Sequence, residues 1–77
     1  MDKFYFKVED NKDYPTIIQD ANICAENMAA AIKQVKRELG VKRVCKIYLS
    51  NENFFDALLS NKKHAERFVE IYKMEER

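Results

Sequence analysis

The first 24 residues alternate between apolar and polar side chains, a pattern typical of strands with one buried face. In residues 3–9 every second side chain is apolar, and the predicted buried set is Phe4, Phe6 and Val8. A polar segment, 10–13, follows, and the alternation resumes in residues 14–24 after Pro15. Two strands joined by a short polar connection predict an antiparallel hairpin.

The period changes from two to about 3.6 after Ala25, which predicts an amphipathic helix. The apolar positions that recur at helical spacing are Met28, Ile32, Val35 and Leu39. We expect this helix to end at Gly40, because the left-handed conformation common at helix ends costs little only for glycine.

Residues 41–49, VKRVCKIYL, are rich in β-branched and aromatic side chains and predict a third strand. Simple alternation along this strand separates two sets of side chains. One set, predicted to face the core, is Val41, Cys45, Ile47 and Leu49, and the other is Lys42, Val44, Lys46 and Tyr48.

The last third of the chain favours two helices. Ser50 is a plausible N-cap for the first, which would bury four apolar side chains, Phe54, Phe55, Leu58 and Leu59. Residues 60–61 offer a break. The second predicted helix, 62–75, carries its apolar stripe at Ala65, Phe68, Val69 and Tyr72.

These elements predict a single small domain over residues 1–77 of class α+β, a three-stranded antiparallel sheet packed with helices in the order ββαβαα. The composition fits a folded chain, because 47% of the residues are hydrophobic and there is one Gly and one Pro. Which face of the sheet the last two helices cover is left open by the sequence.

Several sequence features indicate a cytoplasmic protein. The longest apolar run, residues 28–32, is too short to cross a membrane, and the start, MDKFYFKVED, lacks the pattern of a secretory signal. We therefore expect Cys24 and Cys45 to be reduced and buried, with a disulfide between neighbouring strands as the alternative. His64 is the single histidine, so we expect no metal site and no cofactor.

Charge is unevenly distributed although the chain as a whole carries only +1. Residues 33–49 contain six bases and one acid, net +5, against −3 for residues 1–32 and −1 for residues 50–77. On the helix, the bases face away from the apolar stripe. If helices cover only one side of the sheet, the bare side would display Tyr5, Lys7, Lys42, Val44, Lys46 and Tyr48.

This basic and aromatic surface has three interpretations. The first is ordinary structure without a partner, or with Tyr5, Val44 and Tyr48 as a self-interface in a homodimer. The second is a face that binds another protein by charge and shape. Alternatively, rings could stack on the bases of a single-stranded nucleic acid while lysines neutralise phosphates. The residues predicted to contact a partner are Lys33, Lys36, Arg37, Lys42, Lys46, Tyr48, Tyr5 and Lys7.

Catalysis is not predicted. The two serines, Ser50 and Ser60, are better explained as helix caps, and no spacing places a nucleophile beside a base. The single glycine leaves no phosphate-binding loop. The sequence therefore favours a protein that is not an enzyme.

In size and in the order of its first elements the chain resembles the very small phage-encoded inhibitors of the anti-CRISPR type. The resemblance covers residues 1–49 and includes the segments AENMAAAIKQVKRELG and VKRVCKIYL. It implies a compact, cytosolic, non-catalytic protein that blocks a nucleic-acid-handling complex by charge and shape. The function expected from the sequence is thus a protein-binding module or inhibitor.

Overall fold

The computed structural model describes residues 1–61 and 64–74, and within them it has five strands and one helix. Along the chain these are β1 (Asp2–Asp10), β2 (Ile17–Ala25), α1 (Met28–Leu39), β3 (Arg43–Ser50), β4 (Phe54–Asn61) and β5 (His64–Lys73). The order is ββαβββ. The predicted order ββαβαα with a three-stranded sheet is therefore wrong, whereas the hairpin, the helix and the third strand are confirmed.

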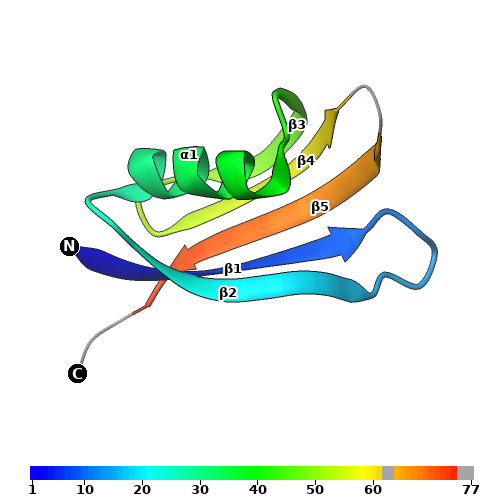
Figure 1. Cartoon of the computed structure of the whole chain (residues 1–77). Helices are drawn as coiled ribbons and strands as arrows, with labels where there is room; N and C mark the ends of the chain where they lie inside the picture. Colours follow the sequence, from blue (N-terminus) through cyan, green and yellow to red (C-terminus); the bar gives the residue numbers. More distant parts are fainter. Residues whose placement is uncertain (62–63, 75–77) are drawn as a thin grey trace.

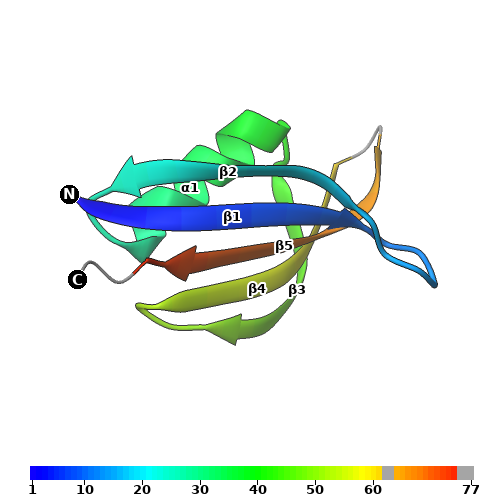
Figure 2. The ribbon, with the colours of Figure 1, turned by 90° about the horizontal axis from the view of Figure 1, so that it is seen from below.

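All neighbouring strands of the sheet are antiparallel, and their order is β2-β1-β5-β4-β3 (Figures 1 and 2). The β1–β2 hairpin forms one side, and the β3–β4–β5 meander forms the other. The two parts join where β5 pairs with β1, with Phe4 opposite Lys73 and Asp10 opposite Arg67. The sheet thus depends on contact between the two ends of the chain.

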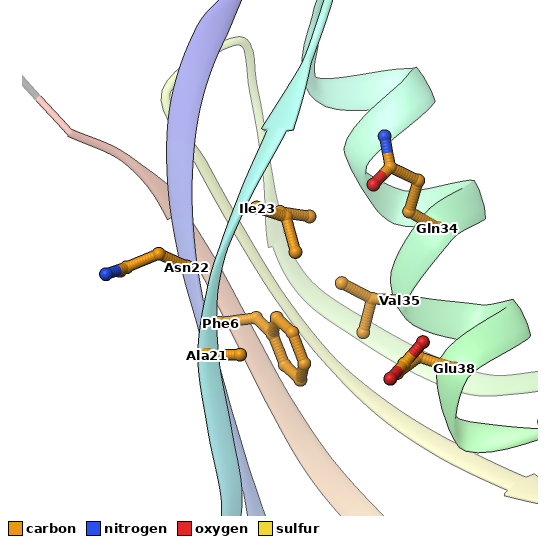
Figure 3. A pocket seen from close by; sticks show the side chains of 7 residues that line it. All are labelled: Phe6, Ala21, Asn22, Ile23, Gln34, Val35 and Glu38. Atoms are coloured by element: carbon orange, nitrogen blue, oxygen red, sulfur yellow. The ribbon is translucent and has the colours of Figure 1, made fainter.

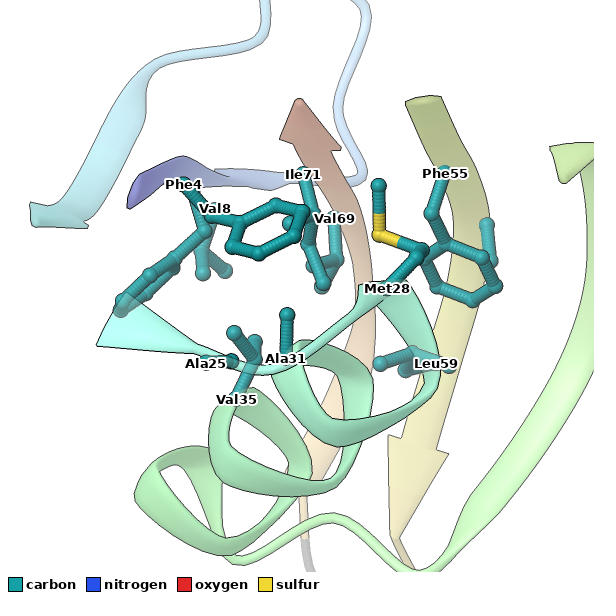
Figure 4. Close-up of a cluster of buried hydrophobic side chains, with 12 residues drawn as sticks. Phe4, Val8, Ala25, Met28, Ala31, Val35, Phe55, Leu59, Val69 and Ile71 are labelled. Carbon is teal, nitrogen blue, oxygen red and sulfur yellow. The ribbon is translucent and has the colours of Figure 1, made fainter. Parts of the chain in front are cut away.

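One face of the sheet packs against α1 (Figure 1). Every second residue of the central strands is buried there, and the helix contributes the side chains at its own apolar spacing (Figure 4). The core consists of Phe4, Phe6, Val8, Ala25, Met28, Ala31, Val35, Phe55, Ala57, Leu59, Val69 and Ile71. Because Ala31 and Ala57 are small and fully buried, the helix can lie close to the strands.

The helix has the expected ends. At its start the side chain of Asn27 accepts a hydrogen bond of 2.9 Å from the backbone N–H of Ala30, an N-cap that the sequence reading did not assign. At its end Gly40 adopts the left-handed conformation with φ of +66°, as predicted. Lys36 and Arg37 lie in the last turn, where positive charge is favourable.

The predicted last two helices are wrong. Their described residues form β4 and β5, while 62, 63 and 75 lie outside the described residues. Both strands carry apolar side chains on both faces, so their sequences do not show the apolar and polar alternation of a half-buried strand. In β5, for example, Val69 is buried, whereas Phe68 and Tyr72 lie on the other face. Ala65, which the helical stripe included, is a β5 residue whose side chain is outside the description.

The predicted alternation along β3 is also wrong, because the strand contains two bulges. Val44 lies opposite Leu59 and Lys46 opposite Leu58, so Cys45 is an extra residue, and Tyr48 is extra in the same way between Ile47 and Leu49. A bulge adds one residue and shifts the facing of those that follow. Val44 and Ile47 consequently share the face of α1, while Lys46 and Leu49 share the other.

The two cysteines are free and exposed, which contradicts their predicted burial. Cys24 is in β2 and Cys45 is at the first bulge of β3, and these strands form opposite edges of the sheet. The alternative of a disulfide between neighbouring strands is therefore wrong as well. Of the four residues of segment 41–49 that were predicted to face the core, Val41 alone packs against it.

Candidate binding surface on the open sheet face

The face of the sheet opposite α1 is not covered by any element of residues 1–61 and 64–74 (Figure 2). We call it the open face. Its side chains alternate with the buried ones along each strand, and they come from all five strands. The open face includes Lys3, Tyr5, Lys7, Glu9, Asp20, Asn22, Cys24, Arg43, Lys46, Tyr48, Leu49, Phe54, Asp56, Leu58, Ser60, Phe68, Glu70 and Tyr72.

Three aromatic rings form a row at one end of the open face. Tyr5 lies opposite Tyr72, and Tyr72 lies opposite Phe54, so cross-strand register brings the rings together. The ring centroids are 5.1 Å apart for Tyr5 and Tyr72 and 6.4 Å apart for Tyr72 and Phe54, the latter pair nearly parallel at 7°. Such contacts hold the rings in fixed orientations and leave Tyr72 partly exposed.

A second apolar group lies toward the β3 edge. Phe68 is opposite Leu58, and the Tyr48 ring lies 6.1 Å from the Phe68 ring. The second bulge directs both Tyr48 and Leu49 to this face, where they are 47% and 48% exposed. Lys46 also faces this way, with its amine 5.0 Å from the centroid of the Tyr48 ring, a cation–π contact.

Between the two apolar groups Lys7 forms ion pairs with two carboxylates. The Nζ of Lys7 lies 3.3 Å from Glu9 Oε1 and 3.2 Å from Glu70 Oε2. Hydrogen bonding to Glu70, then to Glu9, raises the pKa of Lys7. Lys7 therefore remains charged, and its ammonium group is already engaged by Glu9 and Glu70.

Asp56 is the carboxylate that this lysine does not reach. It lies opposite Glu70 on the adjacent strand, and no ion pair or hydrogen bond engages its side chain within the part of the chain that is described. Burial is the main reason that its pKa is raised, the charges of Glu70 and Glu9 add to the effect, and the charge of Lys7 offsets only part of it. A cationic group brought to Asp56 would be stabilised there.

At the β2 side of the open face the hydroxyl of Tyr5 donates a hydrogen bond of 2.8 Å to Asp20 Oδ2. This bond is the main reason that the pKa of Tyr5 is raised. Asp20 also lies opposite Lys7, so the cross-strand row Asp20, Lys7, Glu70, Asp56 contains three acids and one base. The centre of the open face is therefore acidic.

The structure divides the predicted partner-binding residues between two faces. Tyr5 and Lys7 on β1 and Lys46 and Tyr48 on β3 share the open face, but β5 and β4 lie between them. Three others, Lys33, Lys36 and Arg37, lie on α1, on the opposite side of the sheet. Lys42 is exposed in the connection between α1 and β3, and Val44 faces the helix side. They do not form one continuous strip.

The sequence did not predict six side chains of the open face: Phe54, Asp56, Leu58, Phe68, Glu70 and Tyr72. All six belong to segments that were predicted to be helical, so their place beside Tyr5 in one sheet was not expected. A usable signal was present in the alternation of Phe55, Ala57 and Leu59, three buried residues separated by two others.

Comparison of the chain with protein-family models, with curated proteins and with solved structures found no match. Within the described residues no helix has the length and apolar character needed to cross a membrane. The same part of the chain contains no group of three or more His, Cys, Asp or Glu side chains arranged to hold a metal ion.

Proposed function

We propose that this chain is a non-enzymatic protein-binding module of the cytoplasm that engages its partner through the open face. The observation that carries the proposal is the Asp56 carboxylate, which lacks a cation while lying between two groups of partly exposed rings. Rings that are apolar in body and fixed by their neighbours are well suited to anchor a protein partner.

Charge complementarity defines the partner surface that fits. At the centre of the open face Lys7 is the shared cation of Glu9 and Glu70, and Asp56 lies opposite Glu70 without an ion pair. A matching surface would present an arginine or lysine side chain to Asp56, with apolar side chains on either side to cover the rings. Binding of this kind suits an inhibitor that acts by occupying a surface of its target, as the sequence resemblance implies.

The cytoplasmic location is part of the proposal and rests on the cysteines. Cys24 and Cys45 are free and exposed at opposite edges of the sheet. Exposed thiols persist in reducing compartments and are rare in secreted proteins, where they would be oxidised or paired.

Substitution of Asp56 tests the proposal without weakening the fold. In Asp56→Lys the new amine lies beside Glu70, so the variant should be at least as stable as the wild type while repelling a cationic partner group. Both proteins, immobilised, would be used to capture partners from cells of the source organism, with the partner quantified by mass spectrometry. We expect Asp56→Lys to capture at least about tenfold less of the partner than the wild type does.

The matched control is Glu52→Lys, which makes the same change of charge at an exposed position in the β3–β4 turn. It should retain the partner and the thermal stability of the wild type. Equal capture by the wild type and Asp56→Lys would overturn the proposal, as would failure to capture any protein above background at low salt.

Nucleic acid binding by the Tyr and Lys side chains is the alternative, and the charges weigh against it. Lys7 is ion-paired with Glu9 and Glu70, and Asp20 and Asp56 lie in the same row. Phosphates would therefore meet more acids than bases here. Tight, strongly salt-dependent binding of a single-stranded oligonucleotide that Lys46→Ala with Tyr48→Ala abolishes would favour this alternative instead.

A further inference from the structure

A small groove separates β2 from α1 on the helix side of the sheet (Figure 3). It has a volume of about 180 Å³ and is lined by Phe6, Ala21, Asn22, Ile23, Gln34, Val35 and Glu38. Its floor is apolar, because the buried rings and branches of Phe6 and Val35 form it together with Ile23. The volume is below the roughly 300 Å³ of ordinary small-molecule sites and suits a single aliphatic side chain.

The groove borders the backbone of an edge strand. Figure 3 shows the side chain of Asn22 directed away from the helix, so this residue borders the groove through its main chain. Beside it, Ala21 supplies only a methyl group. Within the described residues β2 pairs with β1 alone, which leaves one row of its N–H and C=O groups facing outward.

Of the two edges of the sheet, β2 is the one that another strand can extend regularly. Its pairing with β1 runs without a break from Asp2 opposite Ala25 to Val8 opposite Gln19, with a bulge only at the far end. The other edge, β3, is interrupted by two bulges and carries Lys46 between them. Bulges and lysines are features that block strand addition at an edge.

The helix forms the second wall of this edge. Figure 2 shows the C-terminal end of α1 reaching past β2. The side-chain amide of Gln34 donates a hydrogen bond of 2.9 Å to the backbone carbonyl of Cys24, which ties α1 to β2 at one end of the groove. A strand added beside β2 would thus have a backbone on one side and a fixed helix above it.

The charge around the groove defines the chemistry of what it can hold. Among the residues that line it, Glu38 on α1 is the one that carries a charge. On the helix wall the residue that lines the groove nearest its C-terminal end is Glu38. An extended segment with basic side chains is therefore favoured over an acidic one.

We propose that the groove binds an extended, basic segment of a partner protein, which adds a sixth strand to β2. One of its apolar side chains occupies the space over Ala21, against Ile23 and Val35, and a lysine or arginine two positions away reaches Glu38. Only every second side chain of an added strand points to the helix face, so the apolar residue and the basic residue stand at positions i and i+2 of the segment. This site is separate from the open face and does not rest on the function proposed for it.

The test begins with a phage-displayed library of random dodecapeptides selected on the immobilised full chain. The enriched peptide, synthesised with a fluorescent label, would be titrated with the protein and followed by anisotropy. We expect a consensus with an apolar and a basic residue two positions apart, and a Kd raised about tenfold or more by Glu38→Lys and by Ala21→Arg, which fills and charges the groove. Both positions are exposed, so we expect either variant to fold as the wild type does.

Two control variants separate this site from the open face. Glu52→Lys repeats the charge change of Glu38→Lys at a distant turn, and Asp56→Lys alters the open face. Both should leave the Kd within about twofold of the wild-type value. The proposal is overturned if no peptide is enriched, if binding survives Glu38→Lys and Ala21→Arg, or if only Asp56→Lys abolishes it.

Discussion

Asp56 shows how a side chain can be unfavourable for folding and suited to binding. It faces Glu70 across the β4–β5 pair, and Lys7 is occupied by Glu70 and Glu9. Directly opposed like charges destabilise a sheet, which agrees with the raised pKa of Asp56. A cation brought to Asp56 by a partner would relieve the repulsion between Asp56 and Glu70.

Asp56→Asn should stabilise the protein at neutral pH by about 0.2–1 kcal/mol, the usual range for cross-strand pairs. Because the folded-state pKa of Asp56 lies above the ordinary value of 3.8, ionised Asp56 destabilises the folded protein above that raised pKa. The penalty disappears as the pH falls below 3.8, so the advantage of Asp56→Asn should vanish in the same direction. Urea unfolding of both proteins across this pH range measures the difference.

The control for this prediction is Glu52→Gln, which removes a charge from an exposed turn. It should show no comparable stabilisation at neutral pH and no trend with pH relative to the wild type. An Asp56→Asn protein that is less stable than the wild type at neutral pH would contradict the prediction.

The packing of α1 on the sheet depends on how closely the helix approaches the strands. Ala31 is fully buried on α1, and Ala57 is fully buried on β4. Two alanines allow the one helix to cover the centre of five strands, and larger side chains at these positions would push it outward. The helix wall of the β2 groove depends on the same approach.

Ala31→Leu should destabilise the protein by about 1–3 kcal/mol, because three extra carbon atoms have no space between helix and sheet. Ala29→Leu, at an exposed position of the same helix, changes the sequence equally without that clash and should stay close to the wild type. Chemical denaturation measures both. Equal stability of the two variants would show that α1 does not lie against the sheet as described.

For the molecule as a whole, the strand order decides which distant residues can meet. β2 and β3 lie at opposite edges, four strand spacings apart, which places Cys24 and Cys45 at roughly 19 Å or more. A disulfide needs Cα atoms within about 7 Å. The two thiols therefore face solvent at opposite edges of the sheet.

Both cysteines should react with Ellman's reagent in the folded protein, as quickly as in a denatured sample to within about tenfold, since both are exposed. After mild oxidation the thiols should either remain free or cross-link two molecules into a dimer. Intact mass spectrometry would distinguish both products from a monomer with an internal disulfide. A monomer with a Cys24–Cys45 bond would contradict the strand order. Cys24→Ser and Cys45→Ser identify which thiol forms a dimer.

Part of the candidate surface could be predicted from the sequence. Tyr5, Lys7, Lys46 and Tyr48 were expected on a shared sheet face, and the structure places them on one. Their separation by β5 and β4 was not predictable, because the intervening strands had been read as helices. The acidic character of the centre was missed for the same reason, since Asp56 and Glu70 belong to those strands.

By itself the sequence determined the β1–β2 hairpin, the helix with its stop at Gly40, and the existence of β3. Local periodicity specifies each of them, and the left-handed conformation of Gly40 specifies the end of the helix. Only the tertiary structure decided that residues 54–61 and 64–73 are strands, because Phe54, Leu58 and Phe68 are apolar on the uncovered face and hide the alternation. Pairing of β5 with β1, far away in sequence, and of β4 with β3 and β5 supplies the hydrogen bonds that stabilise the extended conformation.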